Sequence, residues 1–276
     1  MKSLRYCQLG LALLLLLAGG AHAAGCGERV LMASHGGTQM AYALAAPEAG
    51  PARAVVVLLP GGGGHAKLGA DGCARALTGN VLVRIQPQLR AQGLVTVLVD
   101  APSDYQGEDG LAGFREASAH AEDIGLLIRQ LRERLPGLPV WLLGTSRGTI
   151  SAANAAARLS GPAAADGLIL SSVLSQGQAQ ARKAWVAQSV FDLPLEAIRQ
   201  PVLLLGHRSD GCQRSPPALL PKVAARLSAA ARLQQQLIEG GPLGEGSEAC
   251  EGRSPHGYIG QEDELIAAMR DFMALP

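Results

Sequence analysis

Three residues that lie far apart in the chain have the side chains needed for nucleophilic catalysis at a serine. Ser146 lies in the sequence GTSRG at residues 144–148, and Asp210 and His256 follow later. A serine hydroxyl is a poor nucleophile unless a base takes its proton and another group orients that base. Histidine can exchange a proton near neutral pH, and a carboxylate stabilises the imidazolium that forms. These side chains predict acyl transfer through a covalent intermediate.

The two glycines of GTSRG predict a sharp turn that presents Ser146. They stand between an apolar run and an alanine-rich run, which is the pattern of a strand-to-helix connection. A serine between two spaced glycines also arises by chance in a chain with 35 glycines, so the motif decides little alone. Its place after an apolar run, with an aspartate and a histidine following in that order, favours the catalytic interpretation.

The elements that must position these residues alternate between strands and helices. A predicted N-terminal antiparallel hairpin precedes apolar runs without polar alternation, as expected of strands buried on both faces of a parallel sheet. Apolar residues at helical spacing mark two of the intervening segments. We predict one α/β domain over residues 24–276, with a mostly parallel sheet and helices on both faces. The expected strands are residues 29–34, 38–47, 54–60, 93–100, 139–144, 167–173, 201–206 and 231–239, and the two helices are residues 118–135 and 260–275.

This element order, with GTSRG between a strand and a helix, resembles the α/β-hydrolase superfamily over nearly all of residues 24–276. The resemblance implies that Ser146 is the nucleophile, His256 in SPHGYIG the general acid and base, and Asp210 in GHRSDGC the orienting carboxylate. It implies no metal and no organic cofactor.

The same resemblance implies an oxyanion hole made by two backbone N–H groups. Arg147, at the start of a helix, supplies one, and the glycine run that begins at residue 61 supplies the other. We choose Gly62 for the second donor. Pro60 stands where many members of the superfamily have a histidine, which leaves the identity of that donor open.

Other residues could fill these roles. Asp100 also follows an apolar run and is the substitute acid, while Asp210 could instead cap the following helix. His207 is a rival base, but it is very near Asp210 in sequence. We expect His65 to line the oxyanion loop and His120 to lie on a helix surface.

The substrate contacts are expected from two further segments. Residues 174–200 have room for one or two helices, which predicts a minimal cap and an open pocket. Trp185, Val186, Val190 and Phe191 would be its apolar contacts, or would simply pack on the sheet.

The loop over residues 100–113 follows a strand end and should border the site. Its Asp104, Glu108 and Asp109 either contact substrate or are solvated. We predict substrate contacts from Tyr105 in this loop, together with His65 and Trp185.

The side chain of Arg147 stands beside the predicted nucleophile. Its guanidinium either binds a carbonyl or carboxylate or makes a salt bridge on the surface.

Residues 1–23 predict a secretory signal. Lys2 and Arg5 precede an apolar run, and Ala21-His22-Ala23 has the small-x-small pattern of a cleavage site. The run is shorter than the roughly 20 residues that span a bilayer, so we expect no integral membrane span after cleavage and a periplasmic or secreted protein. Lipoprotein anchoring through Cys26 is the alternative, disfavoured because Ala23 stands where such motifs usually have leucine.

The four cysteines beyond the signal predict two disulfides, since an exported protein meets an oxidising compartment. Three pairings are possible. We favour Cys26–Cys73 and Cys212–Cys250, because the second bond would join the loops of the predicted acid and base. The chain has no Cys-x-x-Cys, which disfavours a metal or redox role for these thiols.

Composition narrows the function classes. The net charge is +1 with scattered basic residues, which disfavours nucleic-acid binding, and 3% aromatic residues disfavour a carbohydrate platform. We predict an exported serine hydrolase that cleaves small-molecule carboxylic esters. An amidase or peptidase of the same fold is the nearest alternative. A non-catalytic binding protein on that fold is the alternative from another class, and the complete set of three catalytic residue types argues against it.

Overall fold

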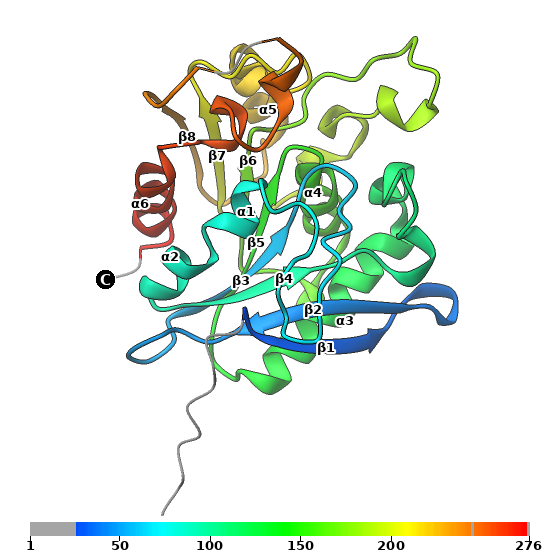
Figure 1. Ribbon diagram of the computed structural model, residues 1–276, viewed down its shortest axis with the longest axis vertical. Coiled ribbons are helices and arrows are strands. Elements are labelled where there is room, and N and C mark those ends of the chain that lie inside the picture. The colour runs from blue at the N-terminus through cyan, green and yellow to red at the C-terminus, as the bar shows by residue number, and fades with distance from the viewer. Residues whose placement is uncertain (1–25, 244–245, 275–276) are drawn as a thin grey trace, which may run out of the picture.

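An eight-stranded sheet runs through the centre of the molecule (Figure 1) in the computed structural model, which describes residues 26–243 and 246–274. The strands lie side by side in the order β1-β2-β4-β3-β5-β6-β7-β8. β1 pairs with β2 and β2 with β4 in antiparallel fashion, whereas the pairs from β4 onward are parallel. The strands are β1 (Glu28–Ala33), β2 (Gln39–Ala45), β3 (Ala54–Leu59), β4 (Leu94–Val99), β5 (Val140–Thr145), β6 (Gly167–Ser171), β7 (Val202–His207) and β8 (Leu233–Ile238).

Helices cover both faces of the sheet. Side chains of a strand alternate between its faces, so Val55 of β3 joins the core under α3, α4 and α5, while Val56 joins the core under α1, α2 and α6. Both sides are apolar, which is why the parallel strands read as unbroken hydrophobic runs. The α-helices are α1 (Val81–Arg84), α2 (Gln86–Ala91), α3 (Ser118–Arg134), α4 (Gly148–Arg158), α5 (Leu220–Arg226) and α6 (Glu262–Phe272).

The segment between β6 and β7 is a minimal cap that differs in detail from expectation. Instead of one or two helices it contains three short 3-10 helices, at Ala184–Ala187, Val190–Asp192 and Leu195–Ala197. Pro194 disfavours helical backbone at the residue before it, which separates the last two. Val190 is fully buried and Phe191 packs against the core, so these two side chains serve packing.

The N-terminal end of the described chain is tied to the loop that follows β3. Cys26 and Cys73 form a disulfide, which is the pairing favoured from the sequence. Gly72 packs so closely here that a Cβ would lie 2.2 Å from the carbonyl oxygen of Gly27. The predicted secretory signal, residues 1–23, lies outside the described residues.

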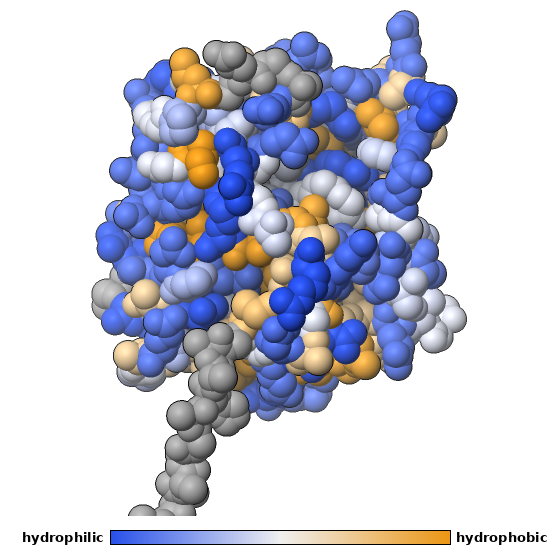
Figure 2. Space-filling model, in the orientation of Figure 1, coloured by the Kyte–Doolittle hydropathy of each residue, from blue (hydrophilic) through white to orange (hydrophobic). Residues whose placement is uncertain are grey.

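The exterior is mainly polar on the face seen in Figure 2, where hydrophobic residues form small separate patches. Within the described ranges, the helices are all too short or too polar to cross a lipid bilayer.

Candidate active site

The turn between β5 and α4 holds Ser146 in a left-handed backbone conformation, with φ of 51°. The two flanking glycines are required by close backbone approaches. A Cβ on Gly144 would lie 2.5 Å from the carbonyl oxygen of Gly148, and one on Gly148 would lie 1.9 Å from that of Leu59. A β5–α4 turn this tight places the serine side chain above the carboxyl end of the sheet.

The strained turn is held by hydrogen bonds on both sides. The Ser146 N–H donates to the carbonyl of Ser171 at 3.0 Å, and its own carbonyl accepts from the N–H and the hydroxyl of Thr149 at 2.9 and 2.6 Å. Left-handed backbone at a non-glycine residue persists only where the surroundings over-determine it. Strand β6 and helix α4 supply those constraints.

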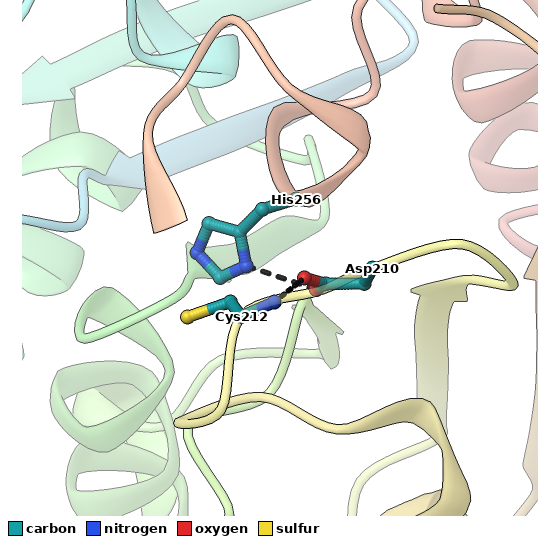
Figure 3. A group of neighbouring side chains, drawn as sticks. All are labelled: Asp210, Cys212 and His256. Atoms are coloured by element: carbon teal, nitrogen blue, oxygen red, sulfur yellow. Dashed lines mark hydrogen bonds and ion pairs between the residues drawn. The ribbon is translucent and has the colours of Figure 1, made fainter. Parts of the chain in front are cut away.

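His256 and Asp210 form a buried pair (Figure 3). Nδ1 of His256 lies 2.9 Å from Oδ2 of Asp210, and Oδ1 of Asp210 accepts the Cys212 N–H at 2.8 Å. A carboxylate fixed in this way favours the proton on Nδ1 and leaves Nε2 as the acceptor. Nε2 is buried and has no hydrogen-bond partner among the described residues.

The side chains of Ser146 and His256 line one cleft of about 210 Å³, at the carboxyl ends of β3 and β5. No direct hydrogen bond joins these two side chains, and catalytic hydrogen bonds often tighten only when a reactant is bound. The cleft brings together the predicted nucleophile, the predicted base and one of the predicted oxyanion donors. Its lining consists of Gly62, Leu77, Gly79, Asn80, Val81, Thr145, Ser146, Cys250, Glu251, Gly252, His256 and Gly257.

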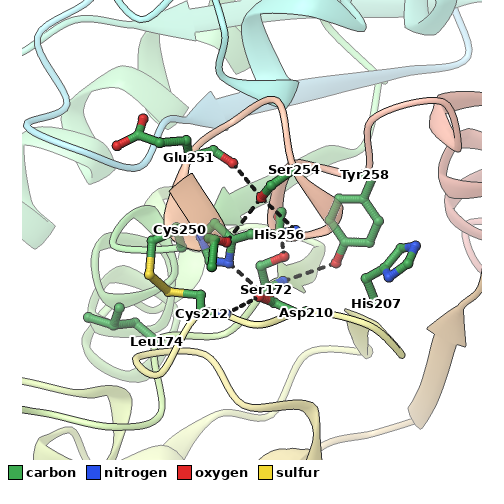
Figure 4. Close-up of polar contacts among 12 residues, drawn as sticks. Ser172, Leu174, His207, Asp210, Cys212, Cys250, Glu251, Ser254, His256 and Tyr258 are labelled. Carbon is green, nitrogen blue, oxygen red and sulfur yellow. Dashed lines mark hydrogen bonds and ion pairs between the residues drawn. A yellow bond between two sulfur atoms is a disulfide. The ribbon is translucent and has the colours of Figure 1, made fainter. Parts of the chain in front are cut away.

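The loop that carries His256 is fixed by Ser172 and Tyr258 (Figure 4). The Ser172 hydroxyl donates to the His256 carbonyl at 2.7 Å, and the Ser172 N–H donates to the Tyr258 hydroxyl at 3.1 Å. Tyr258 is fully buried, and both residues have positive φ, 45° and 55°. Sequence reasoning missed these roles, although Ser172 lies at a strand end where site residues gather.

A disulfide between Cys212 and Cys250 joins the loops that carry the predicted acid and the predicted base. Cys212 lies two positions after Asp210, and Cys250 lines the cleft six positions before His256. Cys212, Asp210 and His256 bring possible metal-ligand atoms within 4.8 Å of one another. Because the Cys212 sulfur is in the disulfide, it offers no thiolate, and the group is a poor metal site.

The glycine run after β3 lies against Ser146. A Cβ on Gly61 would lie 2.9 Å from the Cβ of Ser146, and Gly62 has φ of 56°. Within the described chain, neither the Gly62 N–H nor the Arg147 N–H donates to a protein acceptor. Two unused donors beside a nucleophile can stabilise the oxyanion of a tetrahedral intermediate.

Arg115 holds the glycine run that follows β3. Its fully buried guanidinium donates to the carbonyls of Pro60 and Gly62 at 3.1 and 3.3 Å, and to the Ser151 hydroxyl at 2.7 Å. No carboxylate within the described residues pairs with it, and burial lowers its pKa well below the usual value. Sequence reasoning missed this residue, because an isolated arginine reads as solvent-exposed.

Asp100 and His207, the alternative acid and base, have other partners. Asp100 accepts the N–H groups of Ala66 and Leu68 at 2.7 and 2.9 Å and contacts Nδ1 of His65 at 3.0 Å, so it organises the loop after β3. Nε2 of His207 bonds to the Gly240 carbonyl at 3.0 Å. Neither side chain pairs with the predicted triad.

His120 corrects one expectation, because it is 2% exposed and does not lie on a helix surface. Its ring packs against that of Phe114, with centroids 5.2 Å apart. Burial, followed by the charge of Arg115, lowers the pKa of His120 to about 3. The 3-10 helix Ala112–Glu116 covers this first turn of α3, which periodicity within α3 could not reveal.

The three side chains predicted to contact substrate each have a partner within the protein. His65 bonds to Asp100, and Tyr105 stacks on Phe114 with ring centroids 4.2 Å apart. Neither lines the cleft of Ser146. Trp185 lies under the guanidinium of Arg147, whose Cζ is 3.9 Å from the ring centroid.

The acidic residues of the loop over 100–113 are engaged in ion pairs. Asp104 contacts Nε2 of His35 at 3.0 Å. Asp109 and Glu108 both face Lys183 of the cap.

The chain is similar to known hydrolases in sequence and in fold. A family model described as "Serine aminopeptidase, S33" matches residues 50–202, which include Ser146 and end before Asp210. No match was found among curated protein sequences. Among solved structures, a serine hydrolase without lid from Xanthomonas campestris aligns with TM-score 0.57 and 17% identity, covering 90% of this chain and 96% of its own.

Two esterases of known structure align over a similar extent. A carboxyl esterase from Bacillus coagulans, solved with glycerol, has TM-score 0.61 and 14% identity, with coverage of 90% of this chain and 97% of that one. An esterase from Thermogutta terrifontis has TM-score 0.58 and 16% identity, with coverage of 90% and 94%. At these identities the likeness is one of fold.

Proposed function

The chain belongs to the serine aminopeptidase S33 family of α/β-hydrolases, and we propose that it hydrolyses carboxylic esters with Ser146, His256 and Asp210 as its catalytic triad. The observation that carries the proposal is the shared cleft. Ser146 stands there on a left-handed turn, together with a histidine whose Nδ1 is held by a buried carboxylate.

In the first half-reaction, Oγ of Ser146 attacks the ester carbonyl carbon while Nε2 of His256 takes the hydroxyl proton. The negative charge that develops on the carbonyl oxygen is stabilised by the N–H groups of Gly62 and Arg147. Asp210 stabilises the imidazolium. Collapse of the tetrahedral intermediate breaks the bond to the alcohol oxygen, which leaves with the proton from His256, and the acyl group stays on Ser146.

In the second half-reaction, water attacks the acyl-enzyme and gives a proton to Nε2 of His256. The new tetrahedral intermediate uses the same two N–H donors. Its collapse returns the proton to Oγ of Ser146 and releases the carboxylic acid. The cycle thus consumes one water and needs no redox partner.

Ester bonds are proposed because several proteins of similar fold are named esterases. Amide or peptide bonds are the alternative, since the same triad serves both and the family model is described as an aminopeptidase. Aminoacyl p-nitroanilides separate these two activities. The quantity to compare is the rate acceleration, which is kcat/KM divided by the uncatalysed rate constant. An aminopeptidase would show a larger acceleration for the anilides than for p-nitrophenyl esters of similar size.

We also propose that residues 1–23 are removed on export and that residues 24–276 fold as one domain. The two disulfides support export, because such bonds persist in oxidising compartments. N-terminal sequencing of the protein from a periplasmic extract is expected to begin at Ala24. A mature protein that retains Met1, or that carries lipid on Cys26, would contradict the proposal.

The test of the ester proposal is hydrolysis of p-nitrophenyl acetate and butyrate by the mature protein and by Ser146→Ala. The variant is expected to lose essentially all activity, since the nucleophile is gone. Ser160→Ala, an exposed serine at the end of α4, is the matched control and should keep activity. A wild type that turns over neither ester would contradict the proposal and favour a non-catalytic binding protein.

A further inference from the structure

The side chain of Arg147 bridges the nucleophile turn and the cap. Arg147 follows Ser146 directly, and its guanidinium lies over the ring of Trp185, with Cζ 3.9 Å from the centroid. Trp185 belongs to the 3-10 helix Ala184–Ala187 of the cap, and both side chains are partly exposed. Stacking on a ring face occupies one face of a guanidinium and leaves its N–H edge free.

This guanidinium has no carboxylate of its own. Across residues 26–243 and 246–274, it makes no hydrogen bond to another side chain or carbonyl. Asp109 is the carboxylate that acts on it electrostatically, and Asp109 is already paired with Lys183. Partial burial of a guanidinium costs desolvation free energy, and here no bonded carboxylate of the protein offsets that cost. An anionic group of a ligand would offset it.

A second arginine adds positive charge. Arg214 influences Arg147 electrostatically, and its guanidinium donates to the neutral carbonyls of Gln176 and Gln188 at 2.9 and 3.1 Å. Burial, followed by the charge of Arg214, lowers the pKa of Arg147 to about 10, so it stays charged at neutral pH. Two partly buried guanidiniums, neither of them in an ion pair with a carboxylate among the described residues, therefore lie on the cap side of Ser146.

We propose that Arg147, backed by Arg214, binds a carboxylate of the substrate, so that the preferred esters carry a free carboxylate near the scissile bond. The inference rests on the proposed ester hydrolysis. A planar guanidinium edge can take a carboxylate in two parallel hydrogen bonds, which positions the substrate as well as attracting it. The apolar part of the substrate would occupy the cleft beside Leu77 and Val81.

The experiment compares each anionic ester with its own methyl ester, so that charge is the main difference. One pair places the charge in the acyl part, with mono-4-nitrophenyl glutarate and its methyl ester. The other places it in the alcohol part, with 4-butyryloxybenzoate and its methyl ester. For the wild type, kcat/KM should favour the acid in at least one pair by about 10- to 100-fold, as for a charged hydrogen bond in a partly buried site.

Variants assign the preference to its residue. Arg147→Gln should lower the ratio of kcat/KM for the acid to kcat/KM for the methyl ester to about 1. Arg147→Lys should keep part of the preference, because lysine keeps the charge but lacks the two parallel N–H donors of a guanidinium. Arg199→Gln is the matched control. Arg199 is exposed and precedes β7 at the opposite, amino-end edge of the sheet, and its loss should leave the ratio unchanged.

Two outcomes overturn the inference while the proposed function stands. The wild type could hydrolyse both methyl esters as fast as the acids, or the preference for the acid could survive Arg147→Gln. Failure to hydrolyse all four esters would instead overturn the proposed function, and the inference with it.

Discussion

Nδ1 of His256 lies 2.9 Å from Oδ2 of Asp210, and the other oxygen of that carboxylate is held by the Cys212 N–H. Both side chains are buried, with 4% and 1% of their surfaces exposed. The proposed acid is thus fixed against the proposed base in the protein without substrate. In such a site the carboxylate both selects the histidine tautomer and stabilises the imidazolium.

The first prediction concerns this carboxylate. Asp210→Asn should lower kcat for p-nitrophenyl butyrate by about 10³- to 10⁴-fold. The amide oxygen would stay on the Cys212 N–H, so the NH2 group would face Nδ1 of His256, favour the wrong tautomer and fail to stabilise the imidazolium. Steady-state kinetics measures the effect. Asp100→Asn is the matched control, since Asp100 bonds to loop N–H groups, and it should lose stability more than turnover. The reverse pattern would mean that Asp100 is the acid.

The second prediction concerns the disulfides. Cys212→Ala/Cys250→Ala should lower both the free energy of unfolding, by about 2–4 kcal/mol, and kcat, because the bond joins the loops of acid and base. The Cys26–Cys73 bond closes a loop of similar length but joins neither the loop of the proposed acid nor that of the proposed base, so Cys26→Ala/Cys73→Ala should lower stability with a smaller effect on kcat. Denaturant unfolding and kinetics on the same samples check this. Equal kcat in the two double variants would contradict a positioning role for Cys212–Cys250.

The third prediction concerns Arg115. Arg115→Met removes the donors that hold the carbonyls of Pro60 and Gly62. The Gly62 N–H should then no longer be oriented toward the oxyanion. We expect kcat to fall by about 10- to 100-fold with KM nearly constant, because the hole acts in the transition state. Arg115→Lys should recover part of the loss. A change in KM alone would show that Arg115 does not position the hole.

The fourth prediction concerns Glu116, which lies beneath the cap and accepts a hydrogen bond from Gln188 at 2.9 Å. Burial, followed by the charge of Asp192, raises its pKa to about 7. The folded state therefore binds a proton more tightly than the unfolded state, so this group makes stability fall as pH rises from about 4.5 to 7.

Glu116→Gln should remove that dependence. At pH 8 the free energy of unfolding of the variant is expected to exceed that of the wild type by about 1 kcal/mol. This is less than the full pKa shift would give, because the carboxyl is partly solvated. Near pH 4 the two proteins should be similarly stable. Thermal unfolding at the two pH values measures the difference. A variant that is less stable than the wild type at pH 8 would contradict the assigned charge state.

Much of the fold could be predicted because its signals are local. The α/β-hydrolase fold with a minimal cap is confirmed, since apolar runs such as residues 54–60 become β3 and neighbouring strands and the hairpin precedes them. GTSRG also encodes its own turn, because Gly144 and Gly148 are required by contacts within a few residues or on the adjoining strand end.

The rest depends on contacts between distant positions. Ser172 reaches the His256 carbonyl across 84 positions, and Arg115 reaches Pro60 across 55, so no local pattern could reveal either. His120 is flanked by two alanines in sequence, and it is buried because the 3-10 helix Ala112–Glu116 covers it. Tyr105 follows a strand end, as predicted, but stacks on Phe114 away from the cleft.

Whether Ser146 is an activated nucleophile is tested by the mass and position of the adduct formed with a fluorophosphonate probe. We expect one phosphonyl group per chain, located by peptide mapping on Ser146, with slower labelling in Asp210→Asn and none in Ser146→Ala. Absence of an adduct on the folded wild type, or an adduct on any other residue that persists in Ser146→Ala, would contradict the assignment of Ser146 as an activated nucleophile.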